Sequence, residues 1–453
     1  MSNNNTMLSK LKEVVGEDHV IHDPDKLKDY ALDGKVPRAV VSPGTIEEAS
    51  KTVAYANEQR LGVIPRGNGS KMGIGGIPEK ADLVLSTRRL NRTTDRDCEN
   101  LTLSVESGVT LSEVQRDLGG RGYFLPLDPP FTDKATLGGI VATNSSGPRR
   151  LIYGTARDLI TGIKSIFPNG DVVVSGGKTV KNVSGYDMVK LLIGSLGTLG
   201  VICEITFKLL PLPERKGTLL IHFPGLGDAN GFAHEIMSSQ LIPASLDLLN
   251  ATAADGMRHV MSSRKLDYLV AIGLEGVAEG VDRQISEMGE RGRKHGALNP
   301  VALNAERQDG FWIAVRDVPH GLAKNYPNLI SLKSNVLISK SGELLGSYEK
   351  IANNLGMECA FINRCGNGIL YSHVLVGEDL DSRIDSSVQL ITQFTAEALR
   401  YEGNLVVESA PLAIKEKVDV WGQPRSDYRI MRRLKEEIDP AGTLNPGRFI
   451  GGI

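Results

Sequence analysis

Cysteine is scarce in this sequence, with four residues among 453. No two of them form a Cys-x-x-Cys pair or the spacing of a zinc ribbon, so we expect no iron–sulfur cluster or structural zinc ion in this chain. Free thiols suit a reducing compartment, which predicts a cytoplasmic protein. The cysteines are Cys98, Cys203, Cys359 and Cys365.

Long apolar runs and a strong net charge are also missing. No apolar run reaches the length that spans a bilayer, and the polar stretch from Met1 to Lys10 lacks the apolar core of a signal peptide. Any association with the inner face of a membrane is therefore expected to be peripheral and to depend on a partner. The formal net charge is −2 and Lys and Arg are dispersed, which argues against a nucleic-acid partner.

Glycine, by contrast, is abundant, at 50 residues. Three turns rich in Gly and Thr lead into apolar runs, at residues 135–147, 153–158 and 194–202. Small side chains let a backbone approach a large ligand, whose polar atoms then bind free amides and hydroxyls. Each turn alone fits an ordinary loop, but the three together predict one long cofactor that lies along several strand ends.

A further glycine-rich segment, 66–76, follows a predicted buried strand. Consecutive amides with free glycine dihedrals form nests for anions, and Arg66 and Lys71 add positive charge. The segment is not a P-loop, because Gly-x-x-x-x-Gly-Lys-Ser/Thr is absent, and Met72 stands where a dinucleotide fingerprint requires its third glycine. Taken alone, the segment fits a phosphate site in some other fold and a flexible hairpin equally well.

The predicted fold class is α+β. We expect a short helical segment at 1–35, and then alternating strands and helices at 36–213 that form two α/β lobes. A stiff stretch, Leu209–Pro213, marks a change of composition and a domain boundary. Residues 214–410 lack the glycine clusters and predict an α+β domain with an antiparallel sheet, including a strand at Asn335–Ser339.

The last segment, 411–453, contains an amphipathic helix, Tyr428–Ile438, which Asp439-Pro440 ends. The rigid turn Asn445-Pro446-Gly447 follows it. Such a turn after a helix is able to aim backbone groups at a ligand, so we expect this segment to return toward the cofactor.

Five motifs resemble the flavoproteins of the vanillyl-alcohol oxidase type, in the branch of glycolate oxidase and D-lactate dehydrogenase. Two further segments, 178–187 and 418–422, resemble the FAD-binding E subunit of glycolate oxidase. The five motifs are Pro-Arg-Gly-Asn-Gly-Ser at 65–70, Ala-Thr-Leu-Gly-Gly-Ile-Val-Ala-Thr-Asn at 135–144, Tyr-Gly-Thr-Ala-Arg-Asp at 153–158, Gly-Ser-Leu-Gly-Thr-Leu-Gly-Val-Ile at 194–202 and Leu-Asn-Pro-Gly-Arg-Phe at 444–449.

The resemblance implies an FAD-binding domain at 36–213, a cap at 214–410 and one FAD per chain. The 66–72 loop would hold the pyrophosphate, 136–143 the pyrophosphate and flavin side, and 197–202 the adenosine end. Some relatives attach FAD through a histidine of the first loop; this loop has none, so we expect non-covalent FAD. The implied FAD contacts are Pro65, Arg66, Gly67, Asn68, Gly69, Ser70, Lys71, Met72, Pro129, Thr136, Leu137, Gly138, Gly139, Ala142, Thr143, Gly147, Gly197, Gly200, Val201, Ile202 and Asn445.

The substrate side departs from the family pattern. Catalytic relatives carry His-x-Gly-Asp-Gly-Asn-x-His and then Glu-His-Gly, which bind a divalent metal and the substrate. Here Arg364 and Tyr371 stand at the two histidine positions, and the second motif keeps Glu408 but loses its histidine. Arginine does not ligate metals, so we expect no metal. His373 is either a proton acceptor or, as most single histidines are, a satisfied structural residue.

Arg316 resembles the arginine with which the family binds the substrate carboxylate. A guanidinium suits a carboxylate bidentately, but a surface salt bridge with Asp317 explains Arg316 equally well. Arg364 is a second candidate for this charge role. The candidate catalytic residues are Arg316, Arg364, Tyr371, His373 and Glu408.

Three functions of different classes remain open at this point. The chain is predicted to be the FAD-bearing subunit of a dehydrogenase complex that oxidises a small 2-hydroxy acid and passes electrons to an iron–sulfur partner. The alternatives are a self-sufficient, metal-independent flavin dehydrogenase and a non-catalytic subunit with structural FAD. The sequence does not indicate which hydroxy acid binds.

Overall fold

The computed structural model describes residues 2–178, 187–255, 257, 267–424 and 426–453. The chain divides into two compact units. The first unit comprises Met1–Ser146, Thr155–Leu212 and Gln423–Ile453, and the second comprises Gly147–Gly154 and Pro213–Gly422. Most of the 178–187 segment, which resembles the E subunit, lies outside the described residues. None of the described helices is both long and apolar enough to cross a membrane.

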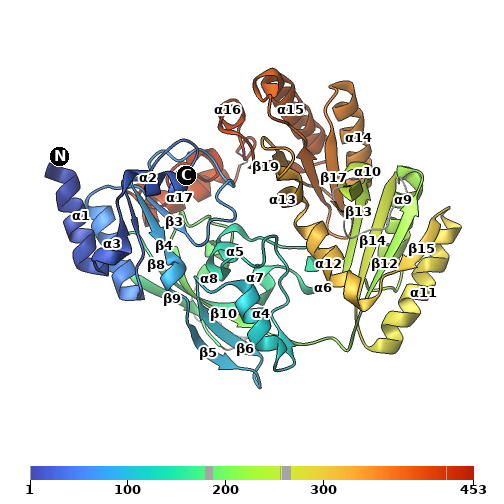
Figure 1. The fold of residues 1–453 in the computed structure, drawn as a ribbon, viewed down its shortest axis with the longest axis horizontal. Coiled ribbons are helices and arrows are strands. Elements are labelled where there is room, and N and C mark those ends of the chain that lie inside the picture. Colours follow the sequence, from blue (N-terminus) through green and yellow to red (C-terminus); the bar gives the residue numbers. More distant parts are fainter. Residues whose placement is uncertain (1, 179–186, 256, 258–266, 425) are drawn as a thin grey trace. The chain divides into compact units, whose positions relative to one another are not determined.

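The first unit contains two main sheets and one two-stranded sheet within the described residues (Figure 1). The smaller has the order β1-β2-β4-β3, and its last three strands are parallel and almost wholly apolar, as expected for strands covered on both faces. Helices α1 and α3 share its apolar cluster. The elements are α1 (Ser2–Val15), β1 (Val20–Ile21), α2 (Pro24–Leu27), β2 (Ala39–Val41), α3 (Ile46–Glu58), β3 (Val63–Arg66) and β4 (Leu83–Ser86).

The larger sheet of this unit is antiparallel, with the order β5-β6-β10-β8-β9. Helix α4 begins with a complete capping box of Thr110 and Glu113, as its sequence predicts. The elements are β5 (Thr93–Asp97), β6 (Thr102–Glu106), α4 (Leu111–Gly119), β7 (Tyr123–Phe124), α5 (Leu137–Thr143), α7 (Ala156–Leu159), β8 (Ile160–Ile166), β9 (Val172–Gly176), α8 (Met188–Leu192), β10 (Val201–Lys208) and β11 (Leu210–Pro211), the last paired with β7.

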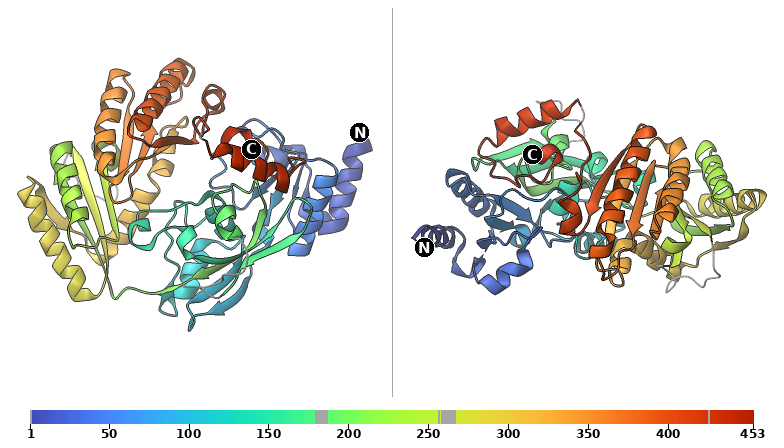
Figure 2. Two further views of the ribbon diagram at one scale, coloured as in Figure 1. Left: turned by 180° about the vertical axis from the view of Figure 1, so that it is seen from behind. Right: turned by 90° about the horizontal axis from the view of Figure 1, so that it is seen from above.

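Of the C-terminal segment, Gln423–Ile453 belongs to the first unit, whereas its first residues, up to Gly422, belong to the second. After α17 (Tyr428–Ile438), the chain runs beside β3, where the Val63 amide donates to the Thr443 carbonyl at 2.7 Å and the Asn445 amide donates to the Val63 carbonyl at 2.8 Å. Both views of Figure 2 place this red segment against the blue and green strands. The segment therefore extends the small sheet beyond β3.

The second unit is built on an antiparallel sheet of order β15-β12-β14-β13-β17-β18-β16-β19 (Figure 1). Helices α9, α11, α14 and α15 pack on one face, and α10, α12 and α13 on the other. The strands are β12 (Arg215–Phe223), β13 (Ser245–Asn250), β14 (Tyr268–Gly276), β15 (Leu298–Ala302), β16 (Ile330–Asn335), β17 (Cys359–Arg364), β18 (Ile369–Val374) and β19 (Asn404–Ser409). The helices are α6 (Arg150–Tyr153), α9 (Leu226–Ser238), α10 (Ala251–Asp255), α11 (Ala278–Lys294), α12 (Ala305–Arg316), α13 (Val318–Ala323), α14 (Ser341–Asn354), α15 (Ile384–Arg400) and α16 (Leu412–Lys415).

The expected strand at Asn335–Ser339 is wrong. Strand β16 ends at Asn335, and a 3-10 turn at Ile338–Lys340 leads into α14. The strand lies instead in the preceding residues, where Ile330, Leu332 and Ser334 alternate on the face covered by α14 and α15. A lysine and two serines interrupt this run and weaken its apolar signal.

A short segment of the glycine-rich region, Gly147–Gly154, belongs to the second unit. Arg149 Nη2 and Tyr153 Oη both donate to Glu275 Oε2 at 2.6 Å. Gly154 has φ 78° and ψ −150°, a conformation that glycine alone adopts readily. The chain thus leaves the first unit after α5 and returns to it before α7.

Candidate cofactor and substrate sites

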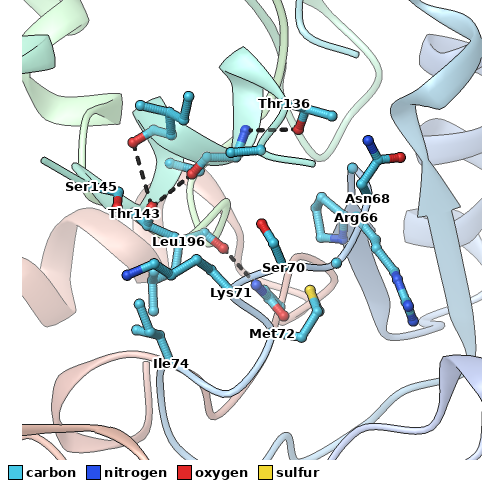
Figure 3. A pocket seen from close by; sticks show the side chains of 18 of the residues that line it. Arg66, Asn68, Ser70, Lys71, Met72, Ile74, Thr136, Thr143, Ser145 and Leu196 are labelled. Atoms are coloured by element: carbon cyan, nitrogen blue, oxygen red, sulfur yellow. Dashed lines mark hydrogen bonds between the residues drawn. The ribbon is translucent and has the colours of Figure 1, made fainter. Parts of the chain in front are cut away.

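The first unit contains a hollow with about 650 Å³ of empty space, part of it open to solvent. In Figure 3, the loop after β3 faces helix α5 across this hollow. Its lining residues are Pro65, Arg66, Gly67, Asn68, Gly69, Ser70, Lys71, Met72, Ile74, Pro130, Ala135, Thr136, Gly139, Ile140, Ala142, Thr143, Ser145, Leu196, Asn445 and Arg448.

The first wall of the hollow is the loop after β3, whose glycine backbone comes so close to its neighbours that a larger side chain would not fit. A Cβ atom on Gly67 would collide with the Thr136 hydroxyl, and Gly69 has φ +78°. The Arg66 guanidinium lies over the Tyr30 ring at 4.6 Å and donates to the Asp29 carbonyl. Burial lowers the pKa of Arg66 from its ordinary value. The tight approach explains why the loop needs glycine.

The opposite wall is helix α5. Thr136 caps its first turn by accepting from the Gly139 amide, and the Thr143 hydroxyl donates to the Gly139 carbonyl at 2.8 Å. Gly139 is exposed, although its neighbours Gly138 and Ile140 are buried. A Cβ on Gly139 would meet nothing closer than the Thr136 hydroxyl at 3.2 Å. The side of Gly139 on which a Cβ atom would lie therefore faces the hollow.

The third wall comes from two distant segments. Asn445 is 4% exposed, and its Nδ2 donates to the Leu196 carbonyl at 2.5 Å. Its Oδ1 is buried without a hydrogen-bond partner. Arg448 donates to the carbonyls of Met72, Ile74 and Gly76 and to Asp33. Burial lowers the pKa of the Arg448 guanidinium to about 10.

These groups fit FAD. An orphaned buried acceptor such as Asn445 Oδ1 suits a ligand N–H, since leaving it unpaired costs about 1–3 kcal/mol. The free backbone of Gly67, Gly69 and Gly139 admits a long, flat ligand at close range. Lys71, which lines the hollow, supplies positive charge for phosphate.

Most predicted cofactor residues line the hollow: all of 65–72, with Thr136, Gly139, Ala142, Thr143 and Asn445. Others lie elsewhere for identifiable reasons. Leu137 is core, Gly138 packs against Ser107, and Gly147 belongs to the second unit. The remaining residues that do not line it are Pro129, Gly197, Gly200 and the buried β10 residues Val201 and Ile202.

Sequence reasoning missed several lining residues, namely Ile74, Pro130, Ala135, Ile140, Ser145, Leu196 and Arg448. Pro130, Ala135 and Ile140 are adjacent to predicted residues and Ser145 is two residues from one, so a wider window would have included them. Leu196 and Arg448 lie in motifs that were recognised, but nothing local distinguishes them from their neighbours.

In the second unit, the structure brings together three of the candidate catalytic residues. The Arg364 guanidinium carbon lies 4.7 Å from the centre of the Tyr371 ring. The Tyr371 and His373 rings are roughly parallel, with centroids 6.3 Å apart, and His373 Nδ1 lies 3.0 Å from the Ser331 hydroxyl. Arg364 and His373 are 5% and 2% exposed. All three project to the face covered by α10, α12 and α13.

Strand pairing places two further charged residues, Lys333 and Asp247, on this face of the sheet. Lys333 lies directly opposite Tyr371 across β16 and β18, and Asp247 lies opposite Arg364 across β13 and β17. Lys333 is half-buried. Neither residue stood out in the sequence, because the pairing of these strands is invisible there. Alternation within β16 would have placed Lys333 on the polar side.

The other two candidate catalytic residues, Arg316 and Glu408, lie less close to the group of Arg364, Tyr371 and His373. Arg316 ends α12, whose Phe311 and Val315 share an apolar cluster with Tyr371, so Arg316 belongs to the same side of the sheet. Its Nε is buried without a hydrogen-bond partner and lies 3.9 Å from Asp317, which is longer than a hydrogen bond. Glu408 is in edge strand β19.

Among the described residues, no group of three or more His, Cys, Asp or Glu side chains is arranged to hold a metal ion. The two histidine positions of the family motif are occupied by the stacked pair Arg364 and Tyr371. A guanidinium offers no lone pair and carries a fixed positive charge. Lys333 and Arg364 give this face a positive charge that Asp247, opposite Arg364, offsets only in part, so the face suits an anion.

Two family models match the chain. The FAD binding domain matches residues 37–176, and the C-terminal domain of FAD linked oxidases matches residues 212–449. The second match covers more than half of the chain.

Several characterised proteins are similar over most of their length. The glycolate oxidase subunit GlcD of Bacillus subtilis is 28% identical over 91% of this chain and 89% of its own. The D-lactate dehydrogenase of Archaeoglobus fulgidus is 28% identical over 91% of each chain. A D-2-hydroxyglutarate dehydrogenase of Xanthomonas citri is 25% identical over 91% of this chain and 89% of its own.

Solved structures show the same fold. p-Cresol methylhydroxylase superposes with a TM-score of 0.81 over 99% of this chain and 97% of its own, at 16% identity. An alkyldihydroxyacetonephosphate synthase gives 0.74 over 98% and 86%, at 20% identity. The expected fold class is confirmed. The chain belongs to the FAD-linked oxidases and is an FAD-dependent oxidoreductase with the fold of the vanillyl-alcohol oxidase type.

Proposed function

We propose that this protein oxidises a small 2-hydroxy acid to the corresponding 2-oxo acid. The observation that carries the proposal is the cationic face of the second unit, where Lys333 and Arg364 flank Tyr371 on two sides. Such a face suits a carboxylate substrate. The names of three relatives point the same way, because glycolate, D-lactate and D-2-hydroxyglutarate are all 2-hydroxy acids.

The reaction removes a hydride from C2 of the substrate and a proton from its hydroxyl group. When bound, FAD supplies the hydride acceptor. Arg316, with Lys333 or Arg364, would bind the carboxylate and fix the orientation of C2. Tyr371 or His373 would take the hydroxyl proton. The Ser331 hydroxyl beside His373 Nδ1 would fix the orientation of that imidazole.

Reoxidation of the cofactor requires an electron acceptor. We propose an iron–sulfur protein as the partner, in a complex that resembles glycolate oxidase. The support is indirect: the four cysteines are unpaired in the structure, and three of them are buried. An iron–sulfur cluster that accepts these electrons would therefore be held by another protein.

Anaerobic addition of D-lactate or glycolate to the purified protein tests the function. Loss of the visible flavin absorbance with the chain alone would make it a self-sufficient dehydrogenase. Loss only in the presence of partner subunits would make it the FAD-bearing subunit of a complex. If neither acid bleaches the flavin under either condition, the proposed substrate class is wrong.

Metal removal is expected to leave the activity unchanged. The reason is the substitution of Arg364 and Tyr371 at the family's two histidine positions, which leaves Glu408 as the only retained acid of the two motifs. Activity should be compared before and after dialysis against a chelator, with elemental analysis of both samples. About one equivalent of zinc, manganese or iron surviving dialysis, or activity lost with the metal, would contradict the expectation.

FAD is expected to be held without a covalent bond, in a one-to-one ratio. None of the described residues that line the hollow is a histidine. Acid or heat denaturation followed by filtration should release intact FAD into the filtrate. Flavin that stays on the denatured polypeptide would refute this prediction.

A further inference from the structure

Lys435 is a buried lysine behind the cofactor hollow, and it does not line the hollow itself. It lies on α17 and is 8% exposed. Its ammonium group donates to Asp439 Oδ2 at 2.6 Å, to the Thr198 carbonyl at 2.7 Å and to the Leu444 carbonyl at 2.9 Å. These three acceptors match the three donors of an ammonium group.

Asp439 organises the turn that follows α17. It is 3% exposed, its Oδ1 accepts from the Thr443 amide at 2.9 Å, and its Oδ2 accepts from the Leu444 amide at 2.7 Å as well as from Lys435. A buried ion pair contributes little net stability, because desolvation offsets the attraction. The pair therefore fixes the geometry of this turn more than it stabilises the fold.

The two carbonyls that Lys435 binds lie close in the chain to two residues with left-handed backbone, a conformation that strains leucine but that asparagine tolerates. Leu196 has φ +54° and Asn445 has φ +48°. A left-handed leucine is a rare conformation that persists only where its surroundings fix it. Thr198 is two residues after Leu196, and Leu444 directly precedes Asn445.

Both left-handed residues line the hollow and contact one another. Asn445 Nδ2 donates to the Leu196 carbonyl, and the Leu196 amide donates to the Ala142 carbonyl of α5 at 2.8 Å. Leu196 is thus tied to α5 on one side and to the C-terminal segment on the other. Lys435 adds a second link between the segment of Leu196 and the C-terminal segment, through the Thr198 and Leu444 carbonyls.

We propose that Lys435 is a positioning residue for FAD: by joining the Thr198 and Leu444 carbonyls, it holds Leu196 and Asn445 in the left-handed conformations that shape the cofactor site. The proposal depends on FAD as the cofactor and not on the identity of the substrate. Loss of the ammonium group would let both segments relax toward ordinary dihedrals, and the orphaned Asn445 Oδ1 would no longer be held in place for the ligand.

The test compares FAD dissociation from two holoprotein variants. Lys435→Met keeps the length of the side chain and removes its charge and donors. Arg92→Met breaks another ion pair of the same unit, whose carboxylate Glu106 is 1% exposed. Neither residue of this pair lines the hollow. Dilution of each holoprotein, followed by the recovery of free-flavin fluorescence, gives the FAD Kd. Urea unfolding gives its stability.

We expect Lys435→Met to raise the FAD Kd about tenfold, equivalent to about 1.4 kcal/mol. Arg92→Met should lower stability and leave the Kd unchanged. If Lys435→Met retains a Kd within about twofold of that of Arg92→Met, the proposal is overturned.

A double variant separates an effect of Lys435 on FAD binding from an effect on the stability of the fold. It also tests the proposal if Lys435→Met alone does not fold. Lys435→Met with Asp439→Asn leaves no unpaired charge, so stability should recover in part relative to Lys435→Met. The recovery is not complete, because an amide side chain offers one acceptor where the carboxylate offers two, to the Thr443 and Leu444 amides. The link between Thr198 and Leu444 stays broken, so the Kd should remain high. Recovery of both quantities together would show that Lys435 acts only on stability.

Discussion

Gly139→Val is expected to yield a folded protein without flavin. Gly139 lies in α5, and the side that would carry its Cβ faces the hollow, where the nearest protein atom is the Thr136 hydroxyl at 3.2 Å. The valine side chain therefore fits the apoprotein and occupies space that the cofactor needs. We expect the protein to be purified colourless, with an FAD Kd raised by about 100-fold or more, equivalent to about 2.7 kcal/mol.

The matched control is Gly119→Val at the end of helix α4. A Cβ at Gly119 would meet nothing within 4 Å, and this residue does not line the hollow. Both substitutions add valine to a helix of the first unit, where the difference in helix propensity is well below 1 kcal/mol. Full flavin occupancy in Gly139→Val would show that the cofactor lies elsewhere, whereas loss of flavin in both variants would point to damage of the fold.

Arg316→Ala is expected to lower kcat/KM for the 2-hydroxy acid by about 100-fold, because removal of one partner from a desolvated charge pair costs about 2–5 kcal/mol. The Nε of Arg316 is buried without a partner, and Asp317 lies 3.9 Å away, so the guanidinium is not held by a short ion pair through that atom. A substrate carboxylate would complete its coordination. Steady-state rates with an artificial electron acceptor measure the effect.

Arg307→Ala is the control, since Arg307 is an exposed residue of the same helix. It removes an equal charge from α12 and should leave kcat/KM unchanged. Arg316→Ala should keep its bound FAD, because Arg316 belongs to the second unit. An unchanged rate in Arg316→Ala would favour the alternative, in which Arg316 serves only as a surface salt bridge with Asp317.

The cofactor loop was predictable because its signal is local. Residues 65–72 combine a buried strand, two glycines and two cations within a few positions, and all of them line the hollow. The fold of the second unit was predictable in class, since alternating apolar residues indicate strands. The order of these strands was not predictable. The pairing of Lys333 with Tyr371 and of Asp247 with Arg364 therefore could not be predicted either.

What sequence reasoning could not find depends on distant pairs. Lys435 binds a carbonyl 237 positions away, and Arg448 binds carbonyls of the 72–76 loop. Within its own helix, Lys435 is one of several charged residues between Tyr428 and Ile438 and has no distinguishing mark. The 135–147 stretch was expected to lie along strand ends, yet part of it forms α5, because Thr136 caps a helix there.

The return of the C-terminal segment to β3 also determines when the cofactor site comes into existence during protein synthesis. Val63 and its loop leave the ribosome early, but their neighbours Thr443 to Arg448 are translated some 380 residues later, after the whole second unit. At about 5–20 residues per second, tens of seconds separate the two events. The nascent chain therefore carries an open, unfinished hollow throughout that interval, and FAD capture must be a late step in the life of the polypeptide.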